Sequence, residues 1–265
     1  MTILFLGDIV AKNGRRAVMR ILPKWKKKYT PDLIVANIEN LAHGKGVTEK
    51  TLAEMYDLGI TVFTSGNHIW SNEMVFSLFE KNTYNGALLR PENYPSELPG
   101  SGLWQGMVGK KHVSVMSLIG RGFMPGDYDC PFRAFDRLWE KVQKDDIILV
   151  DFHAETTSEK AALAWYVDGR ATAVMGTHTH VPTADARKLT KGTFFITDVG
   201  MCGFSDGIIG VQKEEIIASM MLQYRQHKIW PEKGNAVVNG IVMKFPQRKG
   251  GKATFTHVHD KVKIS

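Results

Sequence analysis

The chain has 265 residues, of which 43% are hydrophobic, and it carries a formal net charge of +7. This length and apolar content suffice for one large core, so we expect a single domain over residues 1–265. The positive charge favours anionic partners such as phosphate esters or RNA. Cys130 and Cys202 form neither a C-x-x-C pair nor a zinc-finger pattern, which predicts a cytoplasmic protein. The opening apolar run, residues 2–10, contains an acid and is too short to cross a bilayer, so we expect no membrane partner.

Short apolar runs alternate with helical periodicities along most of the chain. The runs predict strands at residues 3–6, 33–38, 60–64, 146–150, 172–175 and 193–200, two strands within 103–118, and an antiparallel pair at 236–245 and 254–262. Helices are predicted over 15–28, 48–58, 72–79, 132–142, 158–167 and 213–224. Residues 82–102 contain three prolines and are expected to form an ordered excursion near the rim of a site. This order of elements predicts an α/β sandwich, with a mixed sheet or two facing sheets flanked by helices.

Polar residues follow five of the predicted strands, close to the point where each strand ends. They are Asp8, Glu39 with Asn40, Asn67 with His68, His153, and His178 with His180. Ligands of open α/β sheets bind beyond the carboxyl ends of the strands, so we expect these side chains to meet. Taken singly, each has a plain structural alternative, such as a turn cap, a solvated rim position or a hydrogen-bonded core histidine. The joint pattern is what indicates a site.

The pair His178 and His180 follows the apolar run 173–176. If the backbone is extended there, both imidazoles project to the same side, because side chains alternate along a strand with a period of two. Neighbouring neutral imidazoles are well suited to holding a divalent metal. A solvated surface loop is the alternative interpretation of this pair.

The strand-end residues together offer carboxylates, amide oxygens and imidazoles, but no thiolate. Such a set suits manganese, iron, nickel, cobalt or zinc. Six or seven ligands exceed the needs of one metal ion with an open position, and a carboxylate can bridge two ions, so we predict a two-metal centre. Two metals about 3.5–4 Å apart can hold a bridging hydroxide and neutralise the attacking and leaving oxygens of a displacement at phosphorus.

Three blocks of the sequence resemble the motifs of the calcineurin-like metallophosphoesterases: Gly7-Asp8, Gly66-Asn67-His68 and Gly176-Thr177-His178-Thr179-His180. Two positions depart from that superfamily. Val10 stands where the histidine of D-x-H is usual, and Glu39 stands for the bridging aspartate of G-D-x-x-D. Together with Asp151-Phe152-His153-Ala154-Glu155, these departures resemble the YmdB-like branch found in bacteria.

The resemblance runs over nearly the whole chain and implies a metallophosphoesterase-like α/β sandwich with mixed sheets flanked by helices. It also implies a cytoplasmic phosphodiesterase with two metal ions, commonly iron or manganese. The substrates of that branch are cyclic nucleotides, notably 2′,3′-cyclic AMP. The branch is often oligomeric, so the resemblance also raises a homo-oligomer as a partner.

The same resemblance assigns a role to each strand-end residue. One metal would be held by Asp8, Glu39, Asn40 and His180, and the other by Glu39, Asn67, His153 and His178, with Glu39 bridging. His68 would protonate the leaving alkoxide as a general acid, or in the alternative interpretation would orient Asn67. Because Asn40 replaces a histidine, the site is richer in oxygen and favours iron or manganese, as divalent or mixed-valence ions, over zinc.

Two other functions stay open from the sequence. A phosphomonoesterase is one, because sequence does not separate monoester from diester pockets. The other is a basic RNA-binding regulatory protein with structural metals, although none of the aromatic-interleaved basic motifs of common RNA modules is present. The weaker site candidates are Arg15 and Arg121 as phosphate contacts, and His43 and Lys45 as pocket residues. His257 and His259 are predicted to lie on a terminal edge strand, away from the site.

Overall fold

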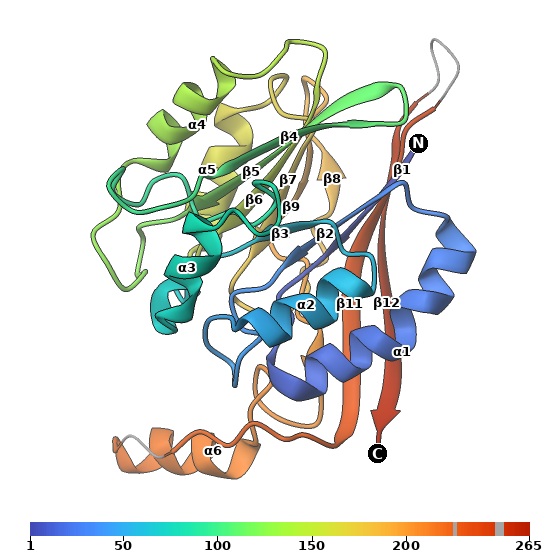
Figure 1. Ribbon diagram of the computed structural model, residues 1–265. Helices are drawn as coiled ribbons and strands as arrows, with labels where there is room; N and C mark the ends of the chain where they lie inside the picture. The colour runs from blue at the N-terminus through green and yellow to red at the C-terminus, as the bar shows by residue number, and fades with distance from the viewer. Residues whose placement is uncertain (225–226, 247–251) are drawn as a thin grey trace.

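The computed structural model describes residues 1–224, 227–246 and 252–265, and two six-stranded β-sheets lie face to face in it with helices on their outer sides (Figure 1). The first sheet contains β1 (Thr2–Leu6), β2 (Leu33–Asn37), β3 (Val62–Thr64), β10 (Gly203–Phe204), β11 (Gly234–Lys244) and β12 (Thr254–Ile264). The second contains β4 (Leu103–Val108), β5 (Lys111–Ile119), β6 (Ile147–His153), β7 (Ala173–Thr177), β8 (Arg187–Lys188) and β9 (Phe194–Ile196). The predicted α/β sandwich is therefore confirmed.

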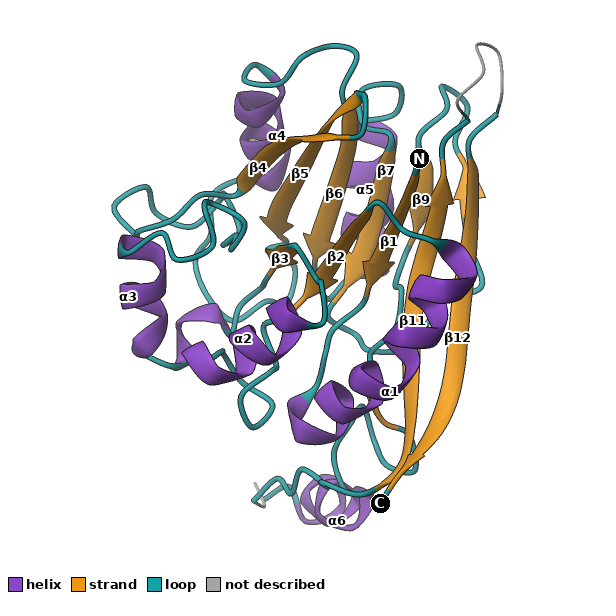
Figure 2. Ribbon diagram, turned by 45° about the vertical axis from the view of Figure 1, so that its right-hand side comes forward, coloured by secondary structure: helices purple, strands orange, loops and turns teal. Residues whose placement is uncertain are grey.

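Each sheet combines a block of parallel strands with antiparallel strands, and in the first sheet this block reaches the edge strand β3. Strands β1, β2 and β3 are parallel in the first sheet, and β11 runs antiparallel to both β1 and β12. Strands β5, β6, β7 and β9 are parallel in the second, where β4 and β8 are the antiparallel edges. The parallel strands of both sheets point toward the same end of the molecule (Figure 2). Loops from two sheets therefore meet at one end, which is where such folds bind ligands.

Side-chain alternation along β1 shows how the layers are built. Ile3 and Phe5 pack between the two sheets, whereas Leu4 and Leu6 pack under the helices of the first sheet. All four are fully buried, as expected for a central strand covered on both faces. Helices α1 (Ala11–Tyr29), α2 (Glu49–Asp57) and α3 (Met74–Glu80) cover the first sheet, and α4 (Pro131–Trp139) and α5 (Thr157–Tyr166) cover the second.

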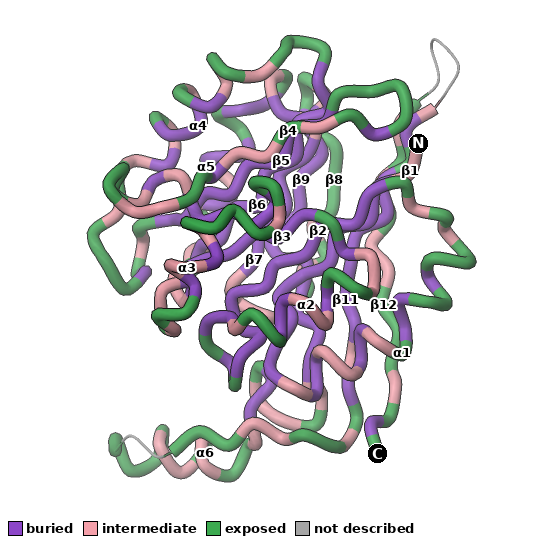
Figure 3. Tube along the Cα trace, in the orientation of Figure 1, coloured by how far each residue is buried: buried purple, intermediate pink, exposed green. Residues whose placement is uncertain are grey.

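The remaining helical segments lie near the end where the loops meet. A 3-10 turn, η1 (Ile69–Ser71), follows β3, and α6 (Lys213–Leu222) projects from the molecule with no buried residue (Figure 3). The predicted N-cap of α2 is confirmed, because the Thr48 hydroxyl accepts a hydrogen bond from the Thr51 backbone N–H at 3.2 Å. Residues 82–102 contact β3 and β5, because the Leu89 backbone N–H donates to the Phe63 carbonyl and the Asn93 amide donates to the Ile119 carbonyl. They line no part of the hollow described below.

Strand β6 is longer than predicted and carries an acid in its interior. The apolar run ends at Val150, but pairing with β5 and β7 continues through Asp151 to His153. Asp151 is fully buried and is satisfied by neighbouring side chains instead of water. An acid that looked like the start of a loop is therefore part of the sheet, because its hydrogen bonds are supplied by the strands beside it.

A buried ion pair joins α5 to the loops at the end of the second sheet. Lys160 Nζ lies 2.9 Å from Asp198 Oδ2, and both side chains are fully buried. Asp198 also accepts hydrogen bonds from the backbone N–H of Thr179 at 3.1 Å and of Gly200 at 2.8 Å. This one carboxylate therefore ties a helix to two loops, one of which carries His178 and His180.

We expect Lys160→Met to lower the free energy of unfolding by about 3–5 kcal/mol, because it leaves the buried Asp198 without its counter-charge. Urea denaturation followed by circular dichroism measures this change. The matched control is Lys12→Met, which removes an exposed ion pair with Glu232 and should change stability by less than about 1 kcal/mol. Equal small effects in the two variants would show that Thr179 and Gly200 alone satisfy Asp198.

Candidate metal centre

The structure brings all seven predicted metal-binding residues together at the end where the loops of the two sheets meet. Asp8, Glu39, Asn40 and Asn67 follow strands of the first sheet, and His153, His178 and His180 end or follow strands of the second. Each makes at least one contact with another member of the set. The strand-end pattern in the sequence therefore located one cluster, although their role as ligands stays a prediction.

His153 lies at the middle of the cluster. Its Nε2 atom is 3.1 Å from Glu39 Oε1, 3.2 Å from Asn67 Oδ1 and 3.0 Å from His178 Nδ1. Ligand atoms of Glu39, His153 and His178 all lie within 4.8 Å of one another. Atoms bound to a common metal at about 2.0–2.2 Å would be separated by distances of this kind. We therefore consider this group the better-formed of two candidate metal positions.

The Thr177 hydroxyl and Asp151 set the tautomer of His153. The Thr177 hydroxyl donates to Asp151 Oδ1 at 2.7 Å, so it accepts from the Nδ1–H of His153 at 2.9 Å. The Nε2 atom is then left with a lone pair that faces the electron-rich atoms of Glu39 and Asn67. A positive charge placed among them would satisfy all three, and metal-binding histidines are commonly oriented by such a partner on the other nitrogen.

Burial keeps two of the histidines neutral. It lowers the pKa of His153 to about 4, and it lowers the pKa of His178 to about 3, with the charge of His153 as the next cause. Neutral imidazole is the form that binds metals, so neither residue needs to lose a proton at pH 7. Burial also raises the pKa of Asp151 to about 7, against the hydrogen bonds from Thr64, Thr177 and Asn37.

The second position is looser and is marked by Asp8. The side chain of Asp8 is fully buried, and its Oδ2 accepts from the His178 backbone N–H at 3.2 Å. Its Oδ1 has no hydrogen-bond partner among the described residues. This Oδ1 lies 3.8 Å from His180 Nε2, and the amide of Asn40 lies 3.3 Å from the same nitrogen. Burial raises the pKa of Asp8, partly opposed by His180 and His153. A buried carboxylate oxygen without a hydrogen-bond donor is suited to binding a cation.

The backbone at the histidine pair differs from the prediction. Strand β7 ends at Thr177, and both His178 and His180 have positive φ angles, 98° and 66°. The extended chain that would place both imidazoles on one side is therefore wrong, and a left-handed turn presents them instead. Side chains with a Cβ rarely adopt such angles, and the hydrogen bonds of Asp198 to this turn help to hold them.

The position of Gly66, directly before Asn67, leaves no room for a side chain. A Cβ at this position would lie 2.2 Å from His153 Cδ2 and 2.3 Å from Glu39 Oε2. The backbone after β3 thus approaches the cluster as closely as it can, and any larger residue would occupy the space between the proposed ligands.

His68 borders the cluster, and both nitrogens of its imidazole lie 3.4 Å from the amide nitrogen of Asn67. Its backbone N–H donates to Glu39 Oε2 at 3.0 Å, while its half-buried imidazole lines a hollow of about 260 Å³. Burial lowers the pKa of His68, the charge of Glu39 opposes this, and Lys45 lowers it further. This hollow is also lined by Glu39, Asn40, Gly44, Lys45, Glu155, His178, Thr179, His180, Ile209, Val211, Lys228 and Trp230.

The weaker candidates fall in different places. Lys45 lines the same hollow, whereas Arg15 is paired with Glu54 at 2.8 Å and lines a neighbouring hollow together with His43. His257 and His259 lie on the edge strand β12, as predicted. Glu155 had no predicted role, although it belongs to the block 151–155, and its Oε2 lies 3.0 Å from His178 Nε2.

The comparisons with known proteins agree with this geometry. The fold is that of metallophosphoesterase-like phosphatases, and the family model described as YmdB-like protein matches residues 4–258. The chain therefore belongs to the YmdB-like family. Among the described residues, no helix has both the length and the apolar character needed to span a membrane.

Three relatives illustrate the similarity. A Bacillus subtilis protein named 2′,3′-cyclic-nucleotide 2′-phosphodiesterase is 48% identical over 218 residues, which are 82% of this chain and 81% of that protein. A crystal structure of a hypothetical protein from Thermus thermophilus has a TM-score of 0.89 at 40% identity, with all of both chains covered. A structure described as a novel phosphatase from Mycoplasma pneumoniae has a TM-score of 0.88 at 33% identity, covering 100% of this chain and 94% of that one.

We expect Asp8→Asn to stabilise the metal-free protein and to weaken its metal binding. Burial raises the pKa of Asp8, so folding disfavours its ionised form at pH 7, and a neutral isostere should raise the free energy of unfolding. Urea denaturation in a chelator measures stability, and titration calorimetry with manganese should show binding weakened by about tenfold or more. The exposed Asp127→Asn is the control and should change neither; undiminished manganese binding by Asp8→Asn would remove Asp8 from the ligands.

Proposed function

We propose that the protein is a two-metal phosphodiesterase that hydrolyses cyclic nucleotides of the 2′,3′-cyclic AMP type, with iron or manganese as its metals. The protein is a hydrolase of phosphoric esters, the class to which its relatives belong. The observation that carries the proposal is the convergence of carboxylate, amide and imidazole donors from both sheets beside one open hollow. The relative from Bacillus subtilis supports a cyclic-nucleotide substrate.

In this proposal the residues hold the metals as the resemblance implies. Asp8, Glu39, Asn40 and His180 would hold one ion, and Glu39, Asn67, His153 and His178 the other. When bound, the two ions would supply positive charge against the phosphoryl oxygens and lower the pKa of water. Asn40 presents its amide nitrogen to Glu39 and His180, and a half-turn of the amide exchanges this nitrogen for the oxygen that a metal requires.

The chain's own groups then position the substrate and move a proton. His68 lines the hollow next to the cluster, where its imidazole can donate a proton to the leaving alkoxide oxygen. Burial lowers the pKa of His68, so its imidazolium is a stronger acid than that of an exposed histidine but is less populated at neutral pH. Glu155 contacts His178 on the nitrogen that points away from His153, which orients this imidazole.

Three further expectations from the sequence stay predictions. They are a cytoplasmic location, a homo-oligomer, and RNA as a partner. The net charge of +7 supports the last of these, and the exposed Lys45 and Lys228 place positive charge at the hollow.

We expect metal-stripped protein to be inactive toward 2′,3′-cyclic AMP and to regain hydrolysis when manganese is added, because the substrate charge is otherwise uncompensated. Product formation is measured by chromatography, with p-nitrophenyl phosphate assayed in parallel. Hydrolysis of the monoester alone would favour the phosphomonoesterase alternative. Loaded protein that hydrolyses neither ester would contradict the proposal.

His68→Ala should retain manganese but lose about 10²- to 10⁴-fold in kcat, the usual contribution of general acid catalysis. Metal retention follows because His68 contacts Glu39 through its backbone N–H, which alanine keeps. Steady-state kinetics and metal analysis provide the two measurements. His112→Ala, an exposed histidine on β5, is the control, and full activity of His68→Ala would exclude His68 as the proton donor.

A further inference from the structure

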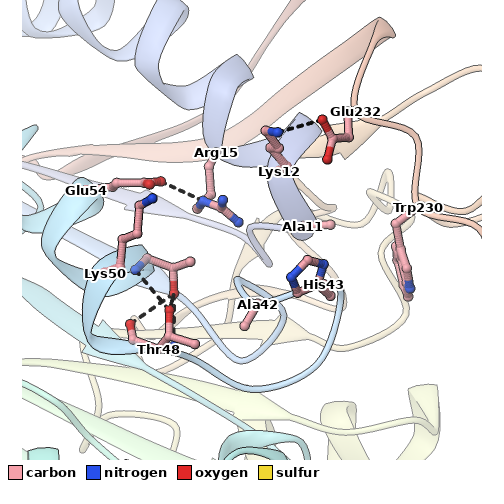
Figure 4. A pocket seen from close by; sticks show the side chains of 11 residues that line it. Ala11, Lys12, Arg15, Ala42, His43, Thr48, Lys50, Glu54, Trp230 and Glu232 are labelled. Atoms are coloured by element: carbon pink, nitrogen blue, oxygen red, sulfur yellow. Dashed lines mark hydrogen bonds and ion pairs between the residues drawn. The ribbon is translucent and has the colours of Figure 1, made fainter. Parts of the chain in front are cut away.

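The hollow beside the candidate metal centre is lined by an aromatic side chain, Trp230, that has no role in the proposed mechanism. Trp230 lines this hollow together with the proposed metal-binding and proton-donating residues. It also lines two neighbouring hollows, one of which Figure 4 shows with Trp230 at one side, beyond His43 and Ala42. Trp230 lies outside every predicted strand, helix and motif, so no role for it was predicted from the sequence.

The indole of Trp230 is held in place by the turn after β2. A Cβ built on Gly44 would lie 2.2, 2.3 and 2.5 Å from three adjacent ring atoms, Cζ2, Cε2 and Cη2. Nearly equal distances to neighbouring atoms mean that Gly44 lies over the face of the ring, since a position beyond its edge would be much closer to one atom. Gly44 has a φ of +79°, so this close approach depends on glycine in two ways.

Two further contacts keep the indole from moving freely. Trp230 packs against the small buried cluster of Val10, Ala11 and Met201. The preceding residue, Ile229, accepts a hydrogen bond from the Gln212 backbone N–H at 3.0 Å, close to Val211 in the lining of the hollow. A half-buried aromatic ring that is fixed in advance loses little entropy when a ligand binds to it.

The surroundings of the indole are basic and suit a nucleotide. Lys45 and Lys228 are exposed residues that line the same hollow, and both also line the next one with Trp230. Aromatic stacking recognises the flat face of any nucleobase, and neighbouring cations favour its phosphate. Because the metal-binding side chains and Trp230 line one hollow, a single nucleotide can contact both.

We propose that Trp230, supported by Gly44, forms a nucleobase-binding subsite, so that the protein selects nucleoside cyclic phosphates over cyclic phosphodiesters without a base. This inference rests on the proposed function and extends it from the phosphate to the base. Since stacking is largely independent of base identity, the subsite accepts purines and pyrimidines and favours the larger purine surface.

The test compares two substrates that share the cyclic phosphate: 2′,3′-cyclic AMP and the 2′,3′-cyclic phosphate of methyl riboside, in which a methoxy group replaces adenine. In Trp230→Ala we expect the ratio of kcat/KM for the nucleotide to that for the baseless ester to fall about tenfold, mainly through KM for the nucleotide. In Trp230→Phe, which keeps an aromatic face, this ratio should stay close to that of the wild type. Trp165→Ala, an exposed tryptophan on α5, is the matched control and should leave the ratio unchanged.

An unchanged ratio in Trp230→Ala, or an equal loss for both substrates, would overturn the inference, because the indole would then act only on the shape of the loop. If Trp230→Ala does not fold, Trp230→Leu offers a bulky side chain without an aromatic face. In this variant too, the ratio of kcat/KM for the nucleotide to that for the baseless ester should fall. Circular dichroism of each variant checks the fold.

A binding measurement separates this inference from the proposed function. Titration calorimetry on the wild type and Trp230→Ala compares adenosine 3′-monophosphate with methyl riboside 3′-monophosphate, and it requires no turnover. If the loaded wild type hydrolyses neither cyclic ester, the proposed function fails, and tighter binding of the adenosine compound still supports the base subsite. Equal binding of the two monophosphates by the wild type would contradict the subsite whatever the activity.

Discussion

The candidate centre depends on electron-rich atoms gathered around one buried nitrogen. His153 Nε2 faces a carboxylate oxygen, an amide oxygen and a second imidazole, all within 3.2 Å. Because the Nδ1–H of His153 donates a hydrogen bond to the Thr177 hydroxyl, the Nε2 atom of this neutral imidazole has no proton to donate to these acceptors. Such an arrangement is unfavourable in isolation and becomes favourable around a cation, so the fold must supply the stability that holds it together.

Two buried acids that are not proposed ligands do much of this holding. Asp151 lies behind His153 and accepts hydrogen bonds from Asn37, Thr64 and Thr177, which belong to three strands of both sheets. Asp198 lies behind the turn of His178 and His180 and is balanced by Lys160. Through these hydrogen bonds and the ion pair, each acid fixes the position of an imidazole relative to the rigid strands and helices. This arrangement follows the general rule that the partners of a ligand matter as much as the ligand itself.

The ends of β1, β2 and β3 were predicted well from the sequence, because a buried strand leaves a continuous apolar run that stops where the chain meets the site. Asp8, Glu39 and Asn67 were found in this way. Backbone turns were not predictable, since nothing in Thr177 to His180 signals positive φ at two histidines. Asp151 looked like a loop residue because its compensating donors come from strands distant in sequence. Trp230 escaped notice for a similar reason: its partner Gly44 is far along the chain, and no periodicity marks the segment.

The division of the proposed ligands between the two sheets has a further consequence. Four of them extend from the first sheet and three from the second, so ions held between them would act as a clasp across the sandwich. Opening of the clasped end would then require release of the ions, which makes unfolding and proteolysis depend on metal supply. A cell short of the metal would hold not only less active protein but protein that is cleared faster, so that its abundance would follow the availability of the ion.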